Sequence, residues 1–320
     1  MKDSRRIRVA VDAMGGDHAP AEIVKGAVLA AGENNLDIAL VGPLDIVQAE
    51  LAKYDASSLP IRCVKAEDVI KEGKDQALAI RRKPDASIAI AAKMLKEGEA
   101  DALVSAGPTG AVVASAIRHL GMIAGIERPV IGGAIFDTLP NTVVFDCGVN
   151  MDCKPYHLLT FALIGSVYCR KLLNIANPTV GLLNIGAEAE KGNQLTKETY
   201  RILKESGLNF IGNVEGNQMM SGCANVLVCD AFVGNVLFKF VESIGMFHDS
   251  AGEENGADLG GGIIWGVNGL IRKLHGASRA PHVALKIRHA GLAVEADLVG
   301  ALKSDLTSIV REIKRQEQRQ

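Results

Sequence analysis

Short apolar runs alternate with longer amphipathic segments along most of the chain. The short runs are rich in β-branched residues, which predicts buried strands, and the longer segments have helical periodicity. We predict strands at residues 7–11, 37–41, 61–64, 102–104, 130–135, 142–145, 179–183, 208–211 and 226–228. We predict helices at residues 21–31, 88–96, 109–120, 156–173, 195–205 and 236–244. This alternation indicates repeated βαβ units, and therefore an α/β fold in three α/β/α layers around a mostly parallel sheet.

Two segments depart from this alternation. Residues 246–262 are rich in glycine and acidic residues and lack periodicity, which predicts a flexible surface loop. Residues 292–319 form one long helical pattern with a basic, polar end, which predicts a C-terminal helix. The sequence contains neither a low-complexity linker nor an internal repeat. We therefore expect a single α/β domain over residues 1–320.

Composition narrows the class of protein. Apolar residues make up 48% of the chain, aromatic residues only 4%, and glycines number 34, which is typical of buried parallel strands joined by tight turns. The net charge of −2 argues against nucleic-acid binding by general electrostatics. The longest apolar run, residues 158–169, is too short to span a bilayer, and the N-terminus lacks a secretory apolar core. Six scattered cysteines without a C-x-x-C pair are typical of the reduced cytosol, so we expect a cytoplasmic protein without a metal site.

Polar residues and glycines gather at the end of the first predicted strand. Asp12 is followed by Gly15, Gly16, Asp17 and His18, and a helix begins directly after them. Glycines let the backbone adopt positive φ or approach a ligand closely, and open α/β sheets hold their ligands at this kind of crossing. The alternative is a tight turn whose acidic residues cap the helix. Both interpretations account for this number of polar groups.

Similar clusters follow other predicted strands. The turn containing Ser105, Gly107, Thr109 and Gly110 opens a helix, so its N–H groups could bind phosphate; an ordinary helix cap is the alternative. Lys191 offers a mobile cation beside a glycine at another strand-to-helix crossing, with a solvated surface lysine as the alternative. Because the carboxyl ends of parallel strands meet at one sheet edge, we expect these clusters to converge along one crevice. Its further candidates are Asn150, Asn184, Gly186, Gly192, Gly234 and Asn235.

The ordered series of motifs resembles a known family. The segments V-D-A-M-G-G-D-H-A-P, S-A-G-x-T-G-A, D-x-G-x-N-x-D, V-G-L-L-N-I-G-x-E-x-x-K-G-N and D-x-F-x-G-N-V occur in this order, together with G-S-V-Y and N-F-I-G-N-V-E. They are similar to the bacterial phosphate acyltransferases of phospholipid synthesis, and the match covers about residues 7–242 and 260–276. The resemblance implies a layered α/β/α fold related to phosphate acetyltransferases and to isocitrate- and isopropylmalate-type dehydrogenases. It also implies a homodimer.

The resemblance implies transfer of a long-chain acyl group from acyl carrier protein to inorganic phosphate, without a cofactor. The acyl phosphate formed would supply a membrane glycerol-3-phosphate acyltransferase. Since phosphate is itself a nucleophile, the protein has to orient it and stabilise charge on the thioester oxygen. We assign Lys191 and Asn235 to this task and the Gly107–Gly110 turn to phosphate. His18 or Asp17 would orient the reactants or assist proton transfer. Arg81 and Arg82 are expected to contact the acidic carrier protein.

The sequence departs from the family pattern in two places. Pro108 stands where the family usually has asparagine, which removes one amide from the proposed phosphate turn. After Phe247 the family usually inserts a basic helical hairpin, but this chain has an acidic loop with Glu253, Glu254 and Asp258, which does not favour peripheral membrane association by that route. The alternatives are a coenzyme A-dependent phosphate acyltransferase and a non-catalytic protein that binds the carrier. An oxidoreductase is disfavoured because the dinucleotide fingerprint is missing.

Overall fold

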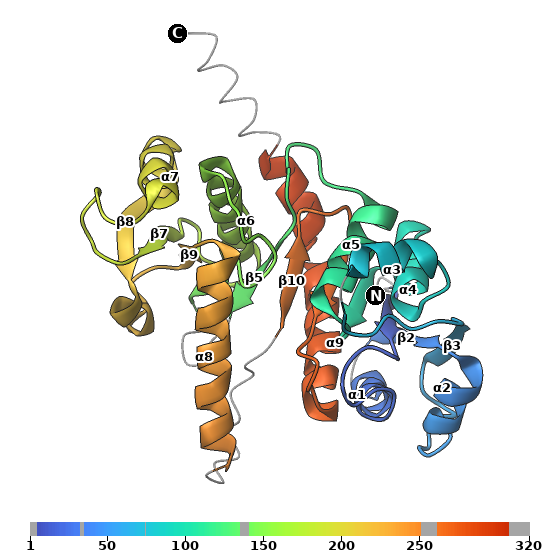
Figure 1. Cartoon of the computed structure of the whole chain (residues 1–320). Coiled ribbons are helices and arrows are strands. Elements are labelled where there is room, and N and C mark those ends of the chain that lie inside the picture. The colour runs from blue at the N-terminus through green and yellow to red at the C-terminus, as the bar shows by residue number, and fades with distance from the viewer. Residues whose placement is uncertain (1–4, 33–34, 74, 135–140, 251–260, 307–320) are drawn as a thin grey trace. The chain divides into compact units, whose positions relative to one another are not determined.

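The computed structural model describes residues 5–32, 35–73, 75–134, 141–250 and 261–306, without the side chains of 220 and 241–250. The chain divides into two compact units. Unit 1 comprises residues 1–122 and 267–297, and unit 2 comprises residues 123–266 and 298–320. That the two units act as one catalytic domain stays a prediction. Figure 1 labels the elements of both units.

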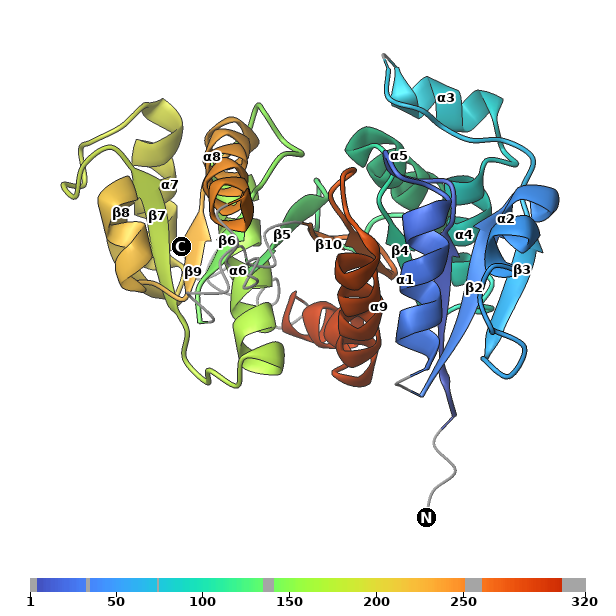
Figure 2. The same cartoon turned by 90° about the horizontal axis from the view of Figure 1, so that it is seen from below.

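Unit 1 is a parallel sheet with helices on both faces (Figure 2). Its strands, in spatial order, are β3 (Ile61–Lys65), β2 (Leu36–Gly42), β1 (Ile7–Asp12), β4 (Ala102–Ser105) and β11 (Leu270–Lys273). Its helices are α1 (Ala21–Ala31), α2 (Leu44–Leu51), α3 (Gln76–Arg82), α4 (Ser87–Lys96), α5 (Thr109–Leu120) and α9 (Ala280–Glu295). Helices α1 and α9 pack together, as do α4 and α5. Because β1 and β4 are covered on both faces, they are almost continuously apolar.

Unit 2 is a mixed sheet. Its strands, in spatial order, are β10 (Gly262–Trp265), β5 (Val130–Ala134), β6 (Val143–Phe145), β9 (Val226–Val228), β7 (Thr179–Asn184) and β8 (Asn209–Glu215). Strand β5 runs antiparallel to both of its neighbours, whereas β6, β9, β7 and β8 are mutually parallel. Its helices are α6 (Pro155–Leu172), α7 (Gln194–Glu205), the 3₁₀ helix η1 (Gly216–Ser221) and α8 (Ala231–Ser250). The prediction of an α/β fold with a mostly parallel sheet is confirmed.

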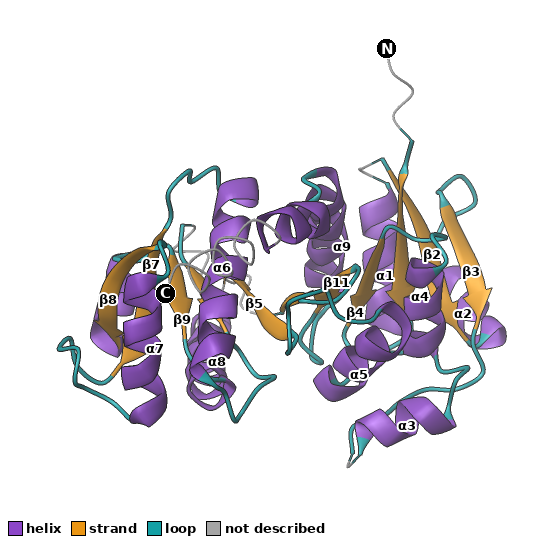
Figure 3. Ribbon diagram, turned by 90° about the horizontal axis from the view of Figure 1, so that it is seen from above, coloured by secondary structure: helices purple, strands orange, loops and turns teal. Residues whose placement is uncertain are grey.

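The carboxyl ends of the parallel strands carry the turns that the sequence singles out (Figure 3). In unit 1, α1 follows β1 and α5 follows β4; in unit 2, α7 follows β7 and α8 follows β9. Each of these turns therefore joins a buried strand to the N-terminus of a helix, where unpaired N–H groups and the helix dipole favour negative charge. Within the described part of the chain, every helix is too short or too polar to cross a membrane.

Two predicted segments differ from the structure. Residues 246–250 belong to α8 rather than to a loop, and the rest of the expected loop, with Glu253, Glu254 and Asp258, lies outside the described residues up to 260. The expected C-terminal helix is interrupted, since α9 ends at Glu295 and a turn at Ala296 and Asp297 precedes a second helical stretch at 298–306. Asp297 has a φ of 47°, a left-handed conformation that a continuous helix cannot contain.

Candidate active site

The first predicted cluster is a buried network at the ends of β1 and β4. Asp12 is the last residue of β1 and is 2% exposed. Ser105 Oγ, at the end of β4, donates a hydrogen bond to Asp12 Oδ2 at 2.7 Å, and Gly107 N donates to Ser105 Oγ at 3.0 Å. Ser87, which begins α4, also hydrogen-bonds to Asp12. The network joins the two turns, and it engages one of the N–H groups that the sequence assigns to phosphate.

Glycines let these two turns meet. A Cβ atom on Gly15 would lie 2.6 Å from both Asp12 Oδ2 and Gly107 N, so a side chain there would separate the turns. Gly16 has a φ of 106°. Asp17 is exposed, and its N donates to Gly276 O at 2.8 Å, which ties the turn to the segment after β11. The structure therefore brings Asp12, Gly15, Ser105 and Gly107 together in unit 1. Their substrate roles, and those of Gly16, Asp17, His18, Thr109 and Gly110, stay predictions.

Asp12 is expected to make the stability of the protein depend on pH. Burial raises the pKa of its carboxyl group above the ordinary 3.8, although hydrogen bonds from Ser87, Ser105 and the backbone oppose this. A folded state that holds the proton more tightly than the unfolded state loses stability as the pH rises from about 3.8 through the raised pKa. Over that range, the free energy of unfolding of the wild type should fall relative to that of Asp12→Asn. Urea titrations at several pH values test this, with the exposed Asp45→Asn as control; a pH-independent difference between wild type and Asp12→Asn would contradict it.

The second cluster, in unit 2, is a loop held by the carboxylate of Asp146. This carboxylate is buried and accepts hydrogen bonds from the backbone N of Gly148, Val149 and Asn150 at 2.9–3.0 Å. Asn150 Nδ2 donates to Asp146 Oδ2 at 2.6 Å and to Pro129 O at 2.8 Å, so the amide predicted for substrate also holds the loop. Burial raises the pKa of Asp146, while these hydrogen bonds lower it.

Helix α8 begins directly against this loop. A Cβ atom on Gly234 would lie 1.7 Å from Asp146 O, so only glycine permits this approach. Asn235 Nδ2 lies 2.8 Å from the Cβ position of Gly148 and donates to Cys147 O at 3.5 Å. The sequence predicts a helix over residues 236–244 with Asn235 at its start, but the structure starts α8 at Ala231. The Asp230 carboxylate accepts from Val233 N at 2.9 Å. Asn235 is thus in the second turn of α8, and its catalytic role stays a prediction.

The third cluster is the turn between β7 and α7. Asn184 ends β7, and its Nδ2 donates to Lys191 O at 3.1 Å. Gly192 has a φ of 89°, and a Cβ atom there would lie 2.4 Å from Asn184 Oδ1 and 2.1 Å from Thr196 Oγ1. The exposed Lys191 lies over Gly186, whose Cβ position is 2.8 Å from Lys191 Cγ. The structure therefore brings Asn184, Gly186, Lys191 and Gly192 together in one turn, and their roles toward a substrate stay predictions.

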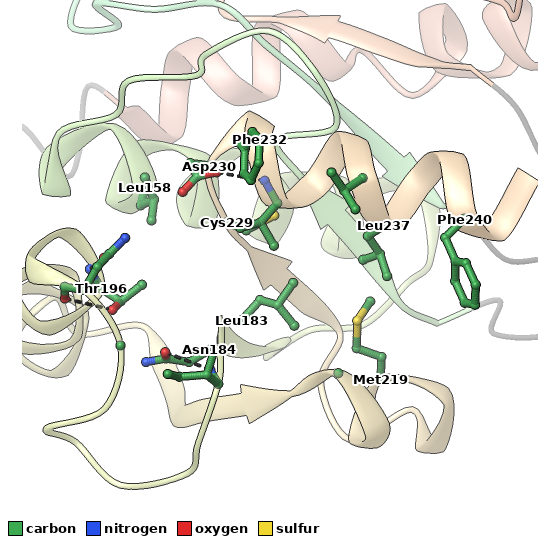
Figure 4. Close-up of a pocket in the computed structure, with 16 residues that line it drawn as sticks. Leu158, Leu183, Asn184, Thr196, Met219, Cys229, Asp230, Phe232, Leu237 and Phe240 are labelled. Atoms are coloured by element: carbon green, nitrogen blue, oxygen red, sulfur yellow. Dashed lines mark hydrogen bonds between the residues drawn. The ribbon is translucent and has the colours of Figure 1, made fainter.

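A groove of about 600 Å³ lies beside this turn (Figure 4). We call it the α8 groove. At one end are polar groups from Asn184 and from the N-termini of α7 and α8, where Asn193 and Asp230 are the capping residues. Its other surfaces are apolar and come from α6, β7, η1 and α8. The lining residues are Leu158, Leu183, Asn184, Ile185, Gly192, Asn193, Thr196, Gly216, Met219, Cys229, Asp230, Phe232, Val233, Val236, Leu237 and Phe240.

Most of the apolar lining was not singled out from the sequence. Phe232, Val236 and Phe240 are spaced by four residues, so they share one face of α8, and they are 67%, 58% and 62% exposed. This spacing of large apolar residues beside the polar motif D-x-F-x-G-N-V is the signal that could have revealed the groove. Met219 carries no such signal, because it reaches the groove from η1, a separate segment.

Comparison with known proteins shows the class of enzyme to which the chain belongs. A family model described as "Fatty acid synthesis protein" matches residues 7–251. The phosphate acyltransferase of Pelotomaculum thermopropionicum is 42% identical over 329 residues, covering 95% of this chain and 96% of that protein. The phosphate acyltransferase of Synechococcus elongatus is 43% identical over 320 residues, covering 91% of both.

Solved structures share the fold at low sequence identity. A phosphotransacetylase from Streptococcus pyogenes has a TM-score of 0.65 at 17% identity, covering 92% of this chain and 94% of that one. A putative 4-hydroxythreonine-4-phosphate dehydrogenase from Salmonella typhimurium has a TM-score of 0.58 at 14% identity, covering 90% and 99%. The fold and the relatives together define an acyltransferase. The chain belongs to the phosphate acyltransferase family.

Proposed function

We propose that this enzyme transfers a long-chain acyl group from acyl carrier protein to inorganic phosphate. The observation that carries the proposal is the α8 groove, which joins a large apolar surface to polar groups at two helix N-termini. A long acyl chain needs such a surface, and a thioester carbonyl that develops negative charge needs hydrogen-bond donors at its end. The names of the relatives support phosphate as the acceptor.

In the proposed reaction, a phosphate oxygen attacks the thioester carbonyl carbon. The C–S bond then breaks, and the carrier thiol leaves with the electron pair and takes up a proton. The Lys191 ammonium stabilises the negative charge of phosphate or of the carbonyl oxygen, and Asn235 hydrogen-bonds to the same oxygens. In the Gly107–Gly110 turn, Gly107 N donates to Ser105 Oγ and Pro108 has no N–H, so the phosphate donors are assigned to the N–H groups of Thr109 and Gly110. His18 or Asp17 orients the reactants or assists proton transfer. In this assignment the protein contributes orientation and electrostatic stabilisation rather than a nucleophile.

Two cysteines, the buried Cys229 and the partly buried Cys153, support direct attack by phosphate over an acyl-enzyme intermediate. Cys229 lines the groove, and burial raises the pKa of its thiol well above the ordinary value. Burial, with Asp146 and Asp230 nearby, raises the pKa of Cys153 to about 12. A protonated thiol is a poor nucleophile. Initial-rate kinetics with both substrates varied should therefore show a ternary complex rather than a ping-pong pattern.

Phosphate-dependent release of free carrier from palmitoyl-acyl carrier protein tests the proposal. Release that requires phosphate, with little turnover of palmitoyl-coenzyme A, supports it. Preference for palmitoyl-coenzyme A would instead indicate the coenzyme A-dependent alternative. Binding of the carrier without release of its acyl group would indicate the non-catalytic alternative.

Arg81 and Arg82 are proposed to contact the acidic carrier protein. Both are exposed at the end of α3 in unit 1. Replacing both by glutamate should raise KM for the acyl carrier about tenfold and weaken its salt dependence, because opposite charges steer encounter and are screened by salt. KM for phosphate should not change. The exposed Lys25→Glu, on α1, is the charge control, and an equal rise of KM in that variant would contradict a specific contact.

The remaining proposals rest on the family resemblance. They are a homodimer, functional coupling to a membrane glycerol-3-phosphate acyltransferase and a cytoplasmic location. Sedimentation at several protein concentrations tests the homodimer.

A further inference from the structure

The two ends of the α8 groove differ in polarity. Figure 4 shows Asn184 and Thr196 at one end, Leu183 between, and Met219 and Phe240 at the other end. Polar groups are concentrated at the first end, where Asn184, Asn193 and Asp230 contribute to the lining. The far end is lined by Met219, Leu237 and Phe240, which have no hydrogen-bonding group suited to a polar ligand. An amphiphilic ligand can therefore lie in the groove in only one direction.

Helix α8 provides the length of the groove. Val233 lies in the first turn of α8 and Phe240 seven residues later, so their Cα atoms are about 10 Å apart along the axis at 1.5 Å per residue. Phe232, Val236 and Phe240 are more than half exposed, which leaves apolar surface that an alkyl chain would cover. An extended acyl chain that begins at the polar end therefore needs several methylene groups to reach Phe240.

We propose that the α8 groove binds the acyl chain and determines the preferred chain length. Phe240 is the residue that distinguishes long chains from short ones. The thioester end lies at Asn184 and the N-termini of α7 and α8, and the tail runs along α8 towards Met219 and Phe240. Residues near the polar end contact every acyl chain, whereas Phe240 contacts only chains long enough to reach it. This inference rests on the proposed acyl transfer and adds the basis of its chain-length preference.

The position of a substitution along α8 should therefore decide which substrates it affects. Burial of each methylene group is worth roughly fourfold in binding. Phe240→Ala should lower kcat/KM for palmitoyl carrier about tenfold, through lost contact with about two methylene groups, and leave that for octanoyl carrier unchanged. Val233→Ala, nearer the polar end, should lower kcat/KM for both chains by similar factors. Phe240→Leu keeps an apolar side chain and should retain most of the palmitoyl activity.

The test is a series of acyl carrier substrates from octanoyl to palmitoyl with the wild type and these three variants. Leu292→Ala, which removes a 55% exposed leucine from α9, is the matched control. A loss that grows with chain length in Phe240→Ala, but not in Val233→Ala or Leu292→Ala, supports the proposal. A loss equal at all chain lengths, or no loss, overturns it.

Two further outcomes are distinguishable. If Phe240→Ala changes the sedimentation coefficient and leaves the chain-length profile unchanged, the exposed face of α8 is a subunit interface and the proposal is overturned. If the wild type releases no carrier from any substrate, the proposed function fails, and binding of the acyl carriers to wild type and Phe240→Ala then tests the groove separately. Chain-length-dependent weakening of that binding in Phe240→Ala would still support the groove, and equal binding would overturn it.

Discussion

Replacing Lys191 by alanine is expected to lower kcat for phosphate-dependent release of carrier by about 10²-fold. Lys191 is exposed on the β7–α7 turn, between Asn184 and Gly192, which line the polar end of the α8 groove, although Lys191 itself does not line it. We propose that its ammonium group reaches the developing charge of the substrate from this turn. The loss should appear mainly in kcat if the interaction is stronger in the transition state than in the ground state. Steady-state kinetics with palmitoyl carrier and phosphate measure both parameters.

Two variants make this result specific. Lys191→Arg keeps the charge and should retain more activity than the alanine variant, although the guanidinium has a different shape. Lys197→Ala removes another exposed lysine, from α7, and should leave kcat unchanged. Turnover near the wild-type value in Lys191→Ala would remove Lys191 from the mechanism, and the proposed electrostatic stabilisation would then have to come from other groups.

Replacing Gly192 by alanine is expected to reduce activity by a similar factor and to destabilise the fold by about 1–3 kcal/mol. The backbone has a φ of 89° there, and the added Cβ atom would lie 2.1 Å from Thr196 Oγ1 and 2.4 Å from Asn184 Oδ1. The turn must therefore move, and with it Asn184 and Lys191. Urea unfolding and turnover measured on the same preparation test both effects.

Gly207→Ala separates the effect of backbone strain from the effect of steric conflict. Gly207 follows α7 with a φ of 75°, and an added Cβ atom would meet nothing within 4 Å. This variant carries the backbone strain without the steric conflict, so it should lose about 1 kcal/mol of stability and keep its activity. Equal losses of activity in Gly192→Ala and Gly207→Ala would contradict a specific role for the Gly192 turn.

The buried strands could be predicted closely because they depend on local pattern. Strand β9 occupies Val226–Val228, as predicted, and β1 differs from its prediction by one residue, Asp12. Strands β10 and β11 were missed, since each is four residues long and β10 adjoins a glycine-rich segment. The antiparallel direction of β5 was missed as well, because an apolar run contains no information about which way its neighbours run.

The candidate site was only partly predictable. The association of Asn184, Gly186, Lys191 and Gly192 follows from a single turn, so local reasoning was sufficient. The hydrogen bond from Ser105 to Asp12 joins residues 93 positions apart, and it depends on β1 and β4 being neighbours in the sheet. That the clusters of the two units line one crevice stays a prediction.

The sequence alone determined the α/β class, the positions of the strand-end turns and the family, because these depend on periodicity and on short ordered motifs. Only the tertiary structure decided the pairing of strands, the engagement of Asn150 with Asp146 and the existence of the α8 groove. The groove combines α6, the β7–α7 turn, η1 and α8, which are brought together by packing around β7 and β9. Burial of apolar surface drives that packing without regard to separation along the chain, so a local pattern cannot specify which side chains will face each other.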